Sequence, residues 1–166
     1  MLDAGVSIHQ VTREKENTMN KMTATTKKST KICYNTGASD PGTAGCYKQA
    51  VRVGNLIFTA GQTSKDPKTG EVIHYGDVRK QTHRIFQNIK GLLAAQGAKM
   101  TDIVKRTIML KNIRDLEAVY EVMAEYFPDP KNYPACSCFV AHELAKRDYM
   151  VEIEVIAAIT EGAESR

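Results

Sequence analysis

The chain has 166 residues, 42% of them hydrophobic and 25% charged, which is enough for one globular domain with a core of its own. Its net charge of +4 could steer an anionic substrate, but it is too small to indicate a nucleic-acid-binding protein. No apolar run reaches the roughly 18 residues of a membrane-spanning helix, so we expect no membrane insertion.

The first 31 residues differ in composition from the rest of the chain. They are rich in Thr, Lys, Asn and Glu and show no sustained apolar period, which predicts a disordered tail at residues 1–31 ahead of a single domain at residues 32–166. An organelle transit peptide is the alternative. Asp3, Glu14 and Glu16 count against it, because such peptides are poor in acidic residues.

Two β-prone segments open the expected domain. Residues 47–53 and 56–59 flank Gly54-Asn55, a dipeptide that suits a tight hairpin turn. Residues 66–70, Asp-Pro-Lys-Thr-Gly, form a polar turn by their chemistry, because proline presets φ and glycine tolerates positive φ.

Two helical segments follow. Apolar residues recur at helical spacing between Asp77, which can cap a helix, and Gly97, which can stop one. Residues 103–111 are predicted to form a strand, and residues 115–127 a second helix that Pro128 ends. The last two strands are expected at residues 136–141 and 150–158.

The resulting order, β-β-α-β-α-β-β, predicts an α+β domain in which two helices pack on one face of a mixed β-sheet. In the last strand Val151, Ile153 and Val155 alternate with Glu152 and Glu154, so one face is apolar and the other carries carboxylates. That second face could meet solvent or another subunit, and composition does not decide between the two.

Several short motifs occur in one order along the chain. They are Gly54-Asn55 with Gly61-Gln62, residues 66–71, Asp102-Ile-Val-Lys105, Pro134-Ala-Cys136-Ser137 and Glu152-Ile-Glu154. Together they resemble the RidA/YjgF family of enamine/imine deaminases, often labelled L-PSP endoribonucleases, over residues 47–158. The resemblance implies a chorismate mutase-like fold, a homotrimer with clefts between its subunits, a small-molecule substrate and no cofactor.

Glu152 is the expected catalytic residue. In the deaminases that the chain resembles, water attacks the carbon of a 2-imino or 2-enamino acid and ammonia leaves, and Glu152 matches the glutamate that positions or activates this water. A carboxylate in a partly dry cleft can do so. The alternative is a solvated strand glutamate, which the residues alone would favour. For Glu154, on the same face, we expect an ion pair with a lysine or arginine.

Further substrate-binding residues follow from the resemblance. Tyr47 matches a tyrosine that lines the pocket, although it could equally fill a sheet edge. Gly61 matches a glycine whose backbone can approach a ligand closely. Ala60 stands where many relatives have serine, so a hydroxyl is lost there. Tyr120 stands where close relatives often carry asparagine and would reshape the cleft. Cys138 matches a pocket cysteine, but packing as a small hydrophobe is the favoured interpretation.

Cys136 is the main departure from the family pattern, which reads Pro-Ala-Arg-Ser where this chain reads Pro134-Ala-Cys136-Ser137. An arginine fork binds a carboxylate bidentately, and a neutral thiol does not. Three interpretations remain open: a substrate without an α-carboxylate, a substitute cation, or binding without catalysis. Arg106 is the candidate substitute because it lies two residues from the apolar Val104 and from the apolar Ile108, so all three are expected on the same, apolar side of the strand. An ion pair with an acidic neighbour is the favoured interpretation for Arg106.

The cysteines indicate no metal site, because Cys136-x-Cys138 lacks the spacing of a zinc ligand pair. Both thiols point to one face of a strand, near the outer limit of about 7 Å for a disulfide, so we expect them to be reduced. Without a signal peptide, the protein is expected to be cytoplasmic. A cysteine–His142 dyad is an alternative catalytic arrangement, and it requires a hydrogen bond between the two side chains.

The sequence therefore predicts hydrolytic deamination of a reactive enamine or imine, such as 2-aminoacrylate or a variant substrate. A non-catalytic metabolite-binding or regulatory trimer is the alternative. An L-PSP-type endoribonuclease or translation inhibitor comes last, because the chain shows neither a basic stripe with interleaved aromatic residues nor paired catalytic histidines.

Overall fold

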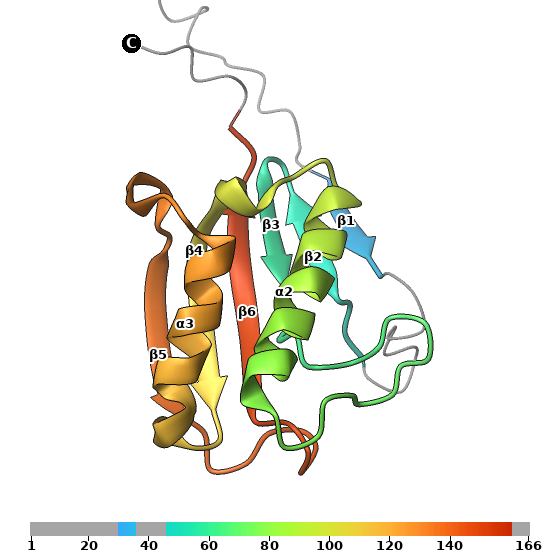
Figure 1. The fold of residues 1–166 in the computed structure, drawn as a ribbon. Helices are drawn as coiled ribbons and strands as arrows, with labels where there is room; N and C mark the ends of the chain where they lie inside the picture. Colours follow the sequence, from blue (N-terminus) through green and yellow to red (C-terminus); the bar gives the residue numbers. More distant parts are fainter. Residues whose placement is uncertain (1–29, 36–45, 161–166) are drawn as a thin grey trace, which may run out of the picture.

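The computed structural model describes residues 30–35 and 46–160, in which two long helices lie across one face of a β-sheet (Figure 1). The tail expected at residues 1–31 lies outside the described residues except for its last two positions. The second of these, Lys31, is the first residue of strand β1.

Six strands form one sheet in the order β1-β2-β3-β6-β4-β5. Their bounds are β1 Lys31–Tyr34, β2 Ala50–Val53, β3 Leu56–Thr59, β4 Ile103–Leu110, β5 Ala135–Val140 and β6 Val151–Ala158. β4 and β5 run parallel and the other neighbours antiparallel, so the sheet is mixed, as predicted. The predicted element order lacks β1, a short edge strand whose mostly exposed side chains give no apolar alternation.

The two helices are α2 (Val78–Ala94) and α3 (Leu116–Tyr126). The Asp77 carboxylate accepts a hydrogen bond from the Lys80 backbone N–H at 3.0 Å, which caps the first turn of α2. Gly97 follows the helix with a φ of 75°, a left-handed conformation that glycine adopts without steric cost. The helix boundaries, the cap and the stop predicted from the sequence are confirmed to within a few residues.

Both predicted turns are present. Gly54, with a φ of 62°, closes the β2–β3 hairpin. Asp66 accepts a hydrogen bond from the Lys68 backbone N–H at 2.7 Å, and Gly70 has a φ of 75°. The turn at Asp66 pairs Lys65 with Val72, and ahead of it Gln62 continues the pairing of β3 with β6 by bonding to Ile153. This pairing determines the position of the candidate site.

The core lies between the helices and the sheet. Val151, Ile153 and Val155 point into it and are at most 2% exposed, so the predicted apolar parity of β6 is confirmed. Ile85, Ile89 and Leu93 of α2, Val119 and Met123 of α3, and Ile57 and Ile108 of the sheet complete this cluster. Burial of these side chains is the main favourable term that holds the helices on the sheet.

β4 contains an irregularity that changes which of its side chains are buried. The pairing with β6 shifts between Ile103 and Lys105, so Val104 is an extra residue on its strand. Val104 is consequently 47% exposed, whereas Arg106 and Ile108 face the helices. The expectation that Val104 shares the parity of Arg106 is wrong, because a bulge reverses the alternation locally.

The opposite face of the sheet carries no helix (Figure 1). Leu56 and Phe58 of β3 are 37% and 40% exposed, and Phe139 of β5 is 50% exposed. Large apolar side chains are therefore present on a face that the single chain leaves uncovered.

Candidate functional site

A polar cavity of about 160 Å³ lies at one end of β6. Its lining includes Tyr47, Gly61, Lys65, Tyr149 and Glu152. Three of the site residues expected from the sequence, Tyr47, Gly61 and Glu152, are therefore brought together although they are far apart in the chain.

Gly61 and Glu152 are held side by side by the backbone. The Gln62 N–H donates to the Ile153 carbonyl at 2.8 Å, and the Ile153 N–H donates to the Gln62 carbonyl at 3.0 Å. Because the two segments run antiparallel, Gly61 and Glu152 lie diagonally on either side of this bonded pair, and the Glu152 side chain reaches across to Gly61. A Cβ atom at position 61 would lie 1.8 Å from Oε1 of Glu152, so only a glycine leaves room for the carboxylate in this orientation.

The Glu152 carboxylate is half-buried and makes no hydrogen bond or ion pair within the described part of the chain. Burial raises the pKa of Glu152 above its ordinary value of 4.5; the negative charge of Glu154 adds to this rise, and Lys65 opposes it. Such a carboxylate is available to a water molecule or a ligand in the cavity.

Glu154 is exposed and lies outside the cavity. The ion pair expected for it is not found among the residues that the structure describes. The register partner of Glu154 on β4 is the neutral Thr107, and the Lys105 side chain on that strand donates to the Ser137 hydroxyl at 2.5 Å.

Two amides of α2, Gln81 and the partly buried Asn88, hold the walls of this cavity, and sequence reasoning missed both. Gln81 of α2 is 0% exposed; its Nε2 donates to the Asp148 carbonyl at 2.8 Å, and its Oε1 accepts from the Met150 N–H at 2.9 Å. Asn88 of α2 donates to the Thr63 and Lys65 carbonyls at 3.2 and 3.0 Å. The position of Gln81 on the apolar side of the predicted helix was the sequence signal that could have indicated its role.

Tyr149 is a further lining residue that the sequence did not indicate. It is 2% exposed, and burial raises the pKa of its phenol. Its hydroxyl lies close to the Thr63 side chain but completes no hydrogen bond of acceptable geometry. The protonated hydroxyl is thus a potential donor within the cavity that holds Glu152.

Three more of the expected residues line a second cavity, of about 230 Å³, between α3 and the β4–β5 edge of the sheet. Arg106, Tyr120, Tyr133 and Cys136 belong to its wall. Arg106 and Cys136 are direct partners in the parallel pairing of β4 and β5. Cys136, which stands where the family pattern has arginine, and Arg106, the candidate substitute cation, are therefore neighbours.

Arg106 is buried, and no ion pair joins it to a carboxylate of the described residues. The ion pair favoured for Arg106 is not found within the described chain, where the aromatic ring of Phe127 rather than an acidic side chain packs against the guanidinium. The Cζ atom lies 4.9 Å from the centroid of that ring.

The remaining two expected residues line neither cavity. Ala60 precedes Gly61, and its N–H donates to the Gln49 carbonyl at 2.8 Å. Cys138 packs against the core, and burial raises the pKa of its thiol. The core packing of Cys138 and the raised pKa of its thiol agree with the packing interpretation of this residue.

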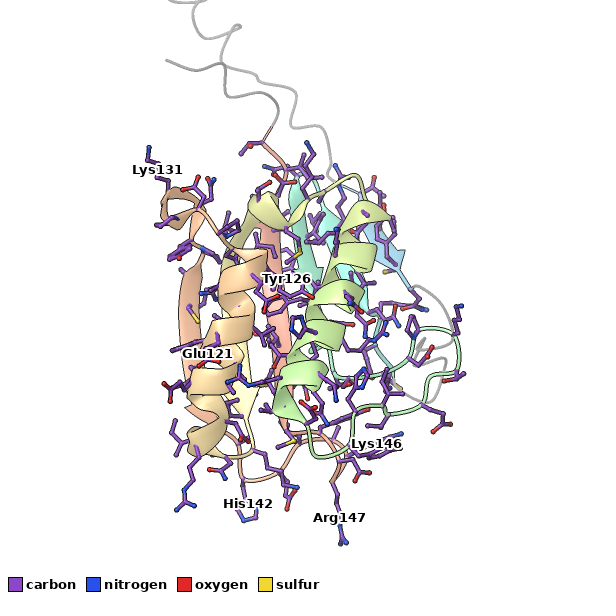
Figure 2. All side chains as sticks on the ribbon, viewed as in Figure 1. Glu121, Tyr126, Lys131, His142, Lys146 and Arg147 are labelled. Carbon is purple, nitrogen blue, oxygen red and sulfur yellow. The ribbon has the colours of Figure 1, made fainter. Side chains whose placement is uncertain are left out.

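The alternative cysteine–histidine dyad is wrong. Neither Cys136 nor Cys138 hydrogen-bonds to His142 within the described residues. Lys131 precedes β5 and His142 follows it, and Figure 2 shows these two labelled residues at opposite ends of the molecule. Cys136 is near the start of that strand, so roughly 20 Å of extended chain separates it from His142.

In the described segments, no three His, Cys, Asp or Glu side chains are arranged to hold a metal ion. Neither helix combines the length and apolar character needed to cross a membrane, as far as residues 30–35 and 46–160 are concerned.

Comparison with known proteins assigns the chain to a family. The family model described as endoribonuclease L-PSP matches residues 37–159. A RutC family protein of Pyrococcus abyssi is 44% identical over 117 residues, covering 70% of this chain and 89% of that protein. A 2-iminobutanoate/2-iminopropanoate deaminase of Escherichia coli is 39% identical over 118 residues, covering 70% and 90%.

Solved structures agree with this assignment. Escherichia coli TdcF with bound serine matches with a TM-score of 0.66 at 32% identity, covering 78% of this chain and 98% of that one. A Rid family protein of Yersinia pestis matches with a TM-score of 0.70 at 32% identity, covering 78% and 100%. The motifs, the mixed sheet with two helices and these similarities agree, and the chain belongs to the RidA/YjgF family.

Proposed function

We propose that this protein hydrolyses a reactive enamine or imine, with Glu152 placing the attacking water. Relatives named 2-iminobutanoate/2-iminopropanoate deaminase in Dermatophagoides farinae and Escherichia coli, at 40% and 39% identity, support this class of reaction. The observation that carries the proposal is the Glu152 carboxylate, which lies against Gly61 in a polar cavity without a hydrogen-bond partner in the described chain.

The proposed reaction consumes one water molecule. The Glu152 carboxylate takes a proton from water as the water oxygen bonds to the iminium carbon and the C=N π electrons move to nitrogen. The same carboxyl group then gives the proton to that nitrogen. The C–N electron pair leaves with ammonia, and the hydroxyl proton passes to it, so that iminium and water become a ketone and ammonium. An enamine first tautomerises to the imine.

We also propose that the complete site needs a second copy of the chain. Glu152 and Tyr47 line one cavity, whereas Tyr120 and Cys136 line another, so one chain does not gather them around a single ligand. The exposed apolar side chains on the uncovered face of the sheet support a homotrimer, in which a neighbouring subunit would bring its second cavity to the first.

The test is deamination of 2-iminopropanoate, generated in solution from alanine by an amino acid oxidase. We expect ammonia release faster than spontaneous hydrolysis, and a loss of roughly 100-fold or more in the Glu152→Gln variant. Glu154→Gln is the matched control, because it removes the same charge two residues along the same strand, and we expect near wild-type rates. Equal acceleration by wild type and Glu152→Gln would exclude this role for Glu152.

A metabolite-binding function is the second candidate, and Cys136 is the observation that favours it. A thiol cannot replace a guanidinium as a carboxylate anchor. Binding of a small metabolite without any acceleration of imine hydrolysis would support this candidate against the first.

A further inference from the structure

Arg106 is a buried cation whose hydrogen-bonding groups lack partners. Its side chain is covered by α3 because the bulge at Val104 places it on the helix-facing side of β4. The residue is 9% exposed. Its Nε and Nη1 are buried without a hydrogen-bond partner in the described chain. A guanidinium removed from water in this way is costly unless an acceptor satisfies its N–H groups.

The contact that Arg106 does make leaves these groups available. Its Cζ lies 4.9 Å from the centroid of the Phe127 ring, which is itself 7% exposed. The face of an aromatic ring attracts the positive charge of a guanidinium. The N–H donors of the guanidinium lie in the plane of the guanidinium itself and are not used in this contact. Phe127 therefore helps to fix the orientation of the side chain without using its hydrogen-bonding capacity.

The cavity beside Arg106 can admit a ligand. Its volume is about 230 Å³. Cys136 is exposed and Tyr120 and Tyr133 are 46% and 55% exposed, so the cavity is open to solvent on that side. Cys136 is the register partner of Arg106 on the neighbouring strand, and its short side chain leaves the space beside the guanidinium unfilled.

The lining of this cavity indicates the charge of the ligand. Arg106 is the single charged residue of the wall, and Met123, Ala124 and Phe127 contribute apolar surface. One guanidinium offers a fork that matches a carboxylate. A dianion such as phosphate would retain an uncompensated charge against an apolar wall. Burial raises the pKa of Tyr120, so its hydroxyl stays protonated as a second donor at the opening.

We propose that Arg106, reaching into this cavity from β4, binds the carboxylate of the substrate and so replaces the arginine that the family pattern has at position 136. The proposal rests on the deaminase function, and it adds that the substrate is a 2-imino acid rather than a decarboxylated imine. Arg106 then determines specificity, and the Cys136 thiol provides room for the carboxylate.

The first experiment measures binding without turnover. Pyruvate, the ketone product of 2-iminopropanoate hydrolysis, is titrated into the full-length protein by calorimetry. We expect Arg106→Gln to weaken its affinity roughly 10- to 100-fold, as the loss of charge-assisted hydrogen bonds implies. Arg147→Gln, which removes the same charge from an exposed loop that Figure 2 shows at the opposite end of the molecule from Lys131, is the control and should bind as the wild type does.

The second experiment moves the guanidinium to the neighbouring strand. In Arg106→Gln/Cys136→Arg the positive charge is restored at the register partner, one interstrand spacing of about 4.8 Å away. We expect this double variant to regain most of the pyruvate affinity and to lower the KM that Arg106→Gln raised. A merely structural role of Arg106 predicts no such rescue.

Three results would overturn the proposal. The first is that Arg106→Gln binds pyruvate as tightly as the wild type does. The second is that the wild type binds inorganic phosphate as tightly as pyruvate. The third is that Arg106→Gln loses the oligomer and that adding Cys136→Arg does not restore it. The last would mean that Arg106 pairs with a second copy of the chain. Failure of the deaminase function can be told apart from failure of the Arg106 proposal. It would appear as equal rates of imine hydrolysis for the wild type and Glu152→Gln, whatever the affinity for pyruvate.

Discussion

The carboxylate of Glu152 occupies the space that any side chain at position 61 would need. A Cβ on Gly61 would lie 1.8 Å from Oε1 and 2.7 Å from Cδ of Glu152. The two residues are held together by the reciprocal backbone hydrogen bonds between Gln62 and Ile153. A glycine on one strand and a carboxylate on its neighbour thus form one structural unit.

Gly61→Ala tests this unit. The methyl group must displace the Glu152 carboxylate, because the backbone on both sides is paired. We expect kcat for imine hydrolysis to fall roughly 10- to 100-fold, since a misplacement of about 1 Å can cost this much. Gly91→Ala is the control: a Cβ there meets nothing within 4 Å, and in helix α2 it should stabilise the protein by about 0.5–1 kcal/mol. An active Gly61→Ala enzyme would contradict the assigned position of the carboxylate.

The pH dependence of activity follows from the raised pKa of Glu152, which burial causes in the first place. The ionised carboxylate is the form that accepts a proton from water, so activity is lost as the pH falls through this pKa. We expect the acid limb of the kcat/KM profile to have its midpoint above the ordinary value of 4.5. A midpoint at or below that value would argue against Glu152 as the titrating group.

The same shift predicts a pH-dependent effect on stability. A carboxyl group whose pKa is higher in the folded than in the unfolded state contributes stability that is fully present below the unfolded pKa and is lost as the pH rises through the folded pKa. Glu152→Gln, which cannot ionise, should therefore melt at a higher temperature than the wild type at neutral pH, and this advantage should shrink below pH 4.5. Thermal melts at several pH values measure this, with Glu154→Gln as the exposed control.

Gln81→Leu removes the amide that joins α2 to the start of β6. Leucine is similar in size but leaves the Met150 N–H and the carbonyls of Asp148 and His74 without this partner. We expect the free energy of unfolding to fall by roughly 2–4 kcal/mol, measured in urea, and kcat to fall as Glu152 loses its support. Gln87→Leu, on the exposed side of the same helix, should change stability by less than about 0.5 kcal/mol.

Phe58→Glu tests the proposed assembly. The side chain is 40% exposed on the uncovered face of the sheet, where a buried charge in a subunit interface would be costly. We expect light scattering to show a mass near three times 18.4 kDa for the wild type and a shift toward a single chain for the variant. Ile113→Glu, an exposed apolar position just before α3, should leave the mass unchanged. A monomeric wild type would refute the trimer.

The order and bounds of most elements could be predicted because their signals are local. Asp77 and Gly97 mark the ends of α2, Gly54 marks the hairpin, and the period-2 alternation of β6 identifies its buried face. β1 escaped prediction because an edge strand with exposed side chains has no such period. The positions of Glu152, Gly61 and Tyr47 in one cavity agree with what the family motifs implied.

The sequence by itself determined the family, the two-layer arrangement of helices on a mixed sheet and the absence of an arginine at position 136, since these depend on residue types and short spacings. Tertiary structure alone decided what surrounds Arg106. A bulge in β4 turns it toward α3, Phe127 rather than a carboxylate packs against it, and strand pairing sets it beside Cys136. Each of these contacts joins segments that are distant in the chain, so no local pattern could reveal them.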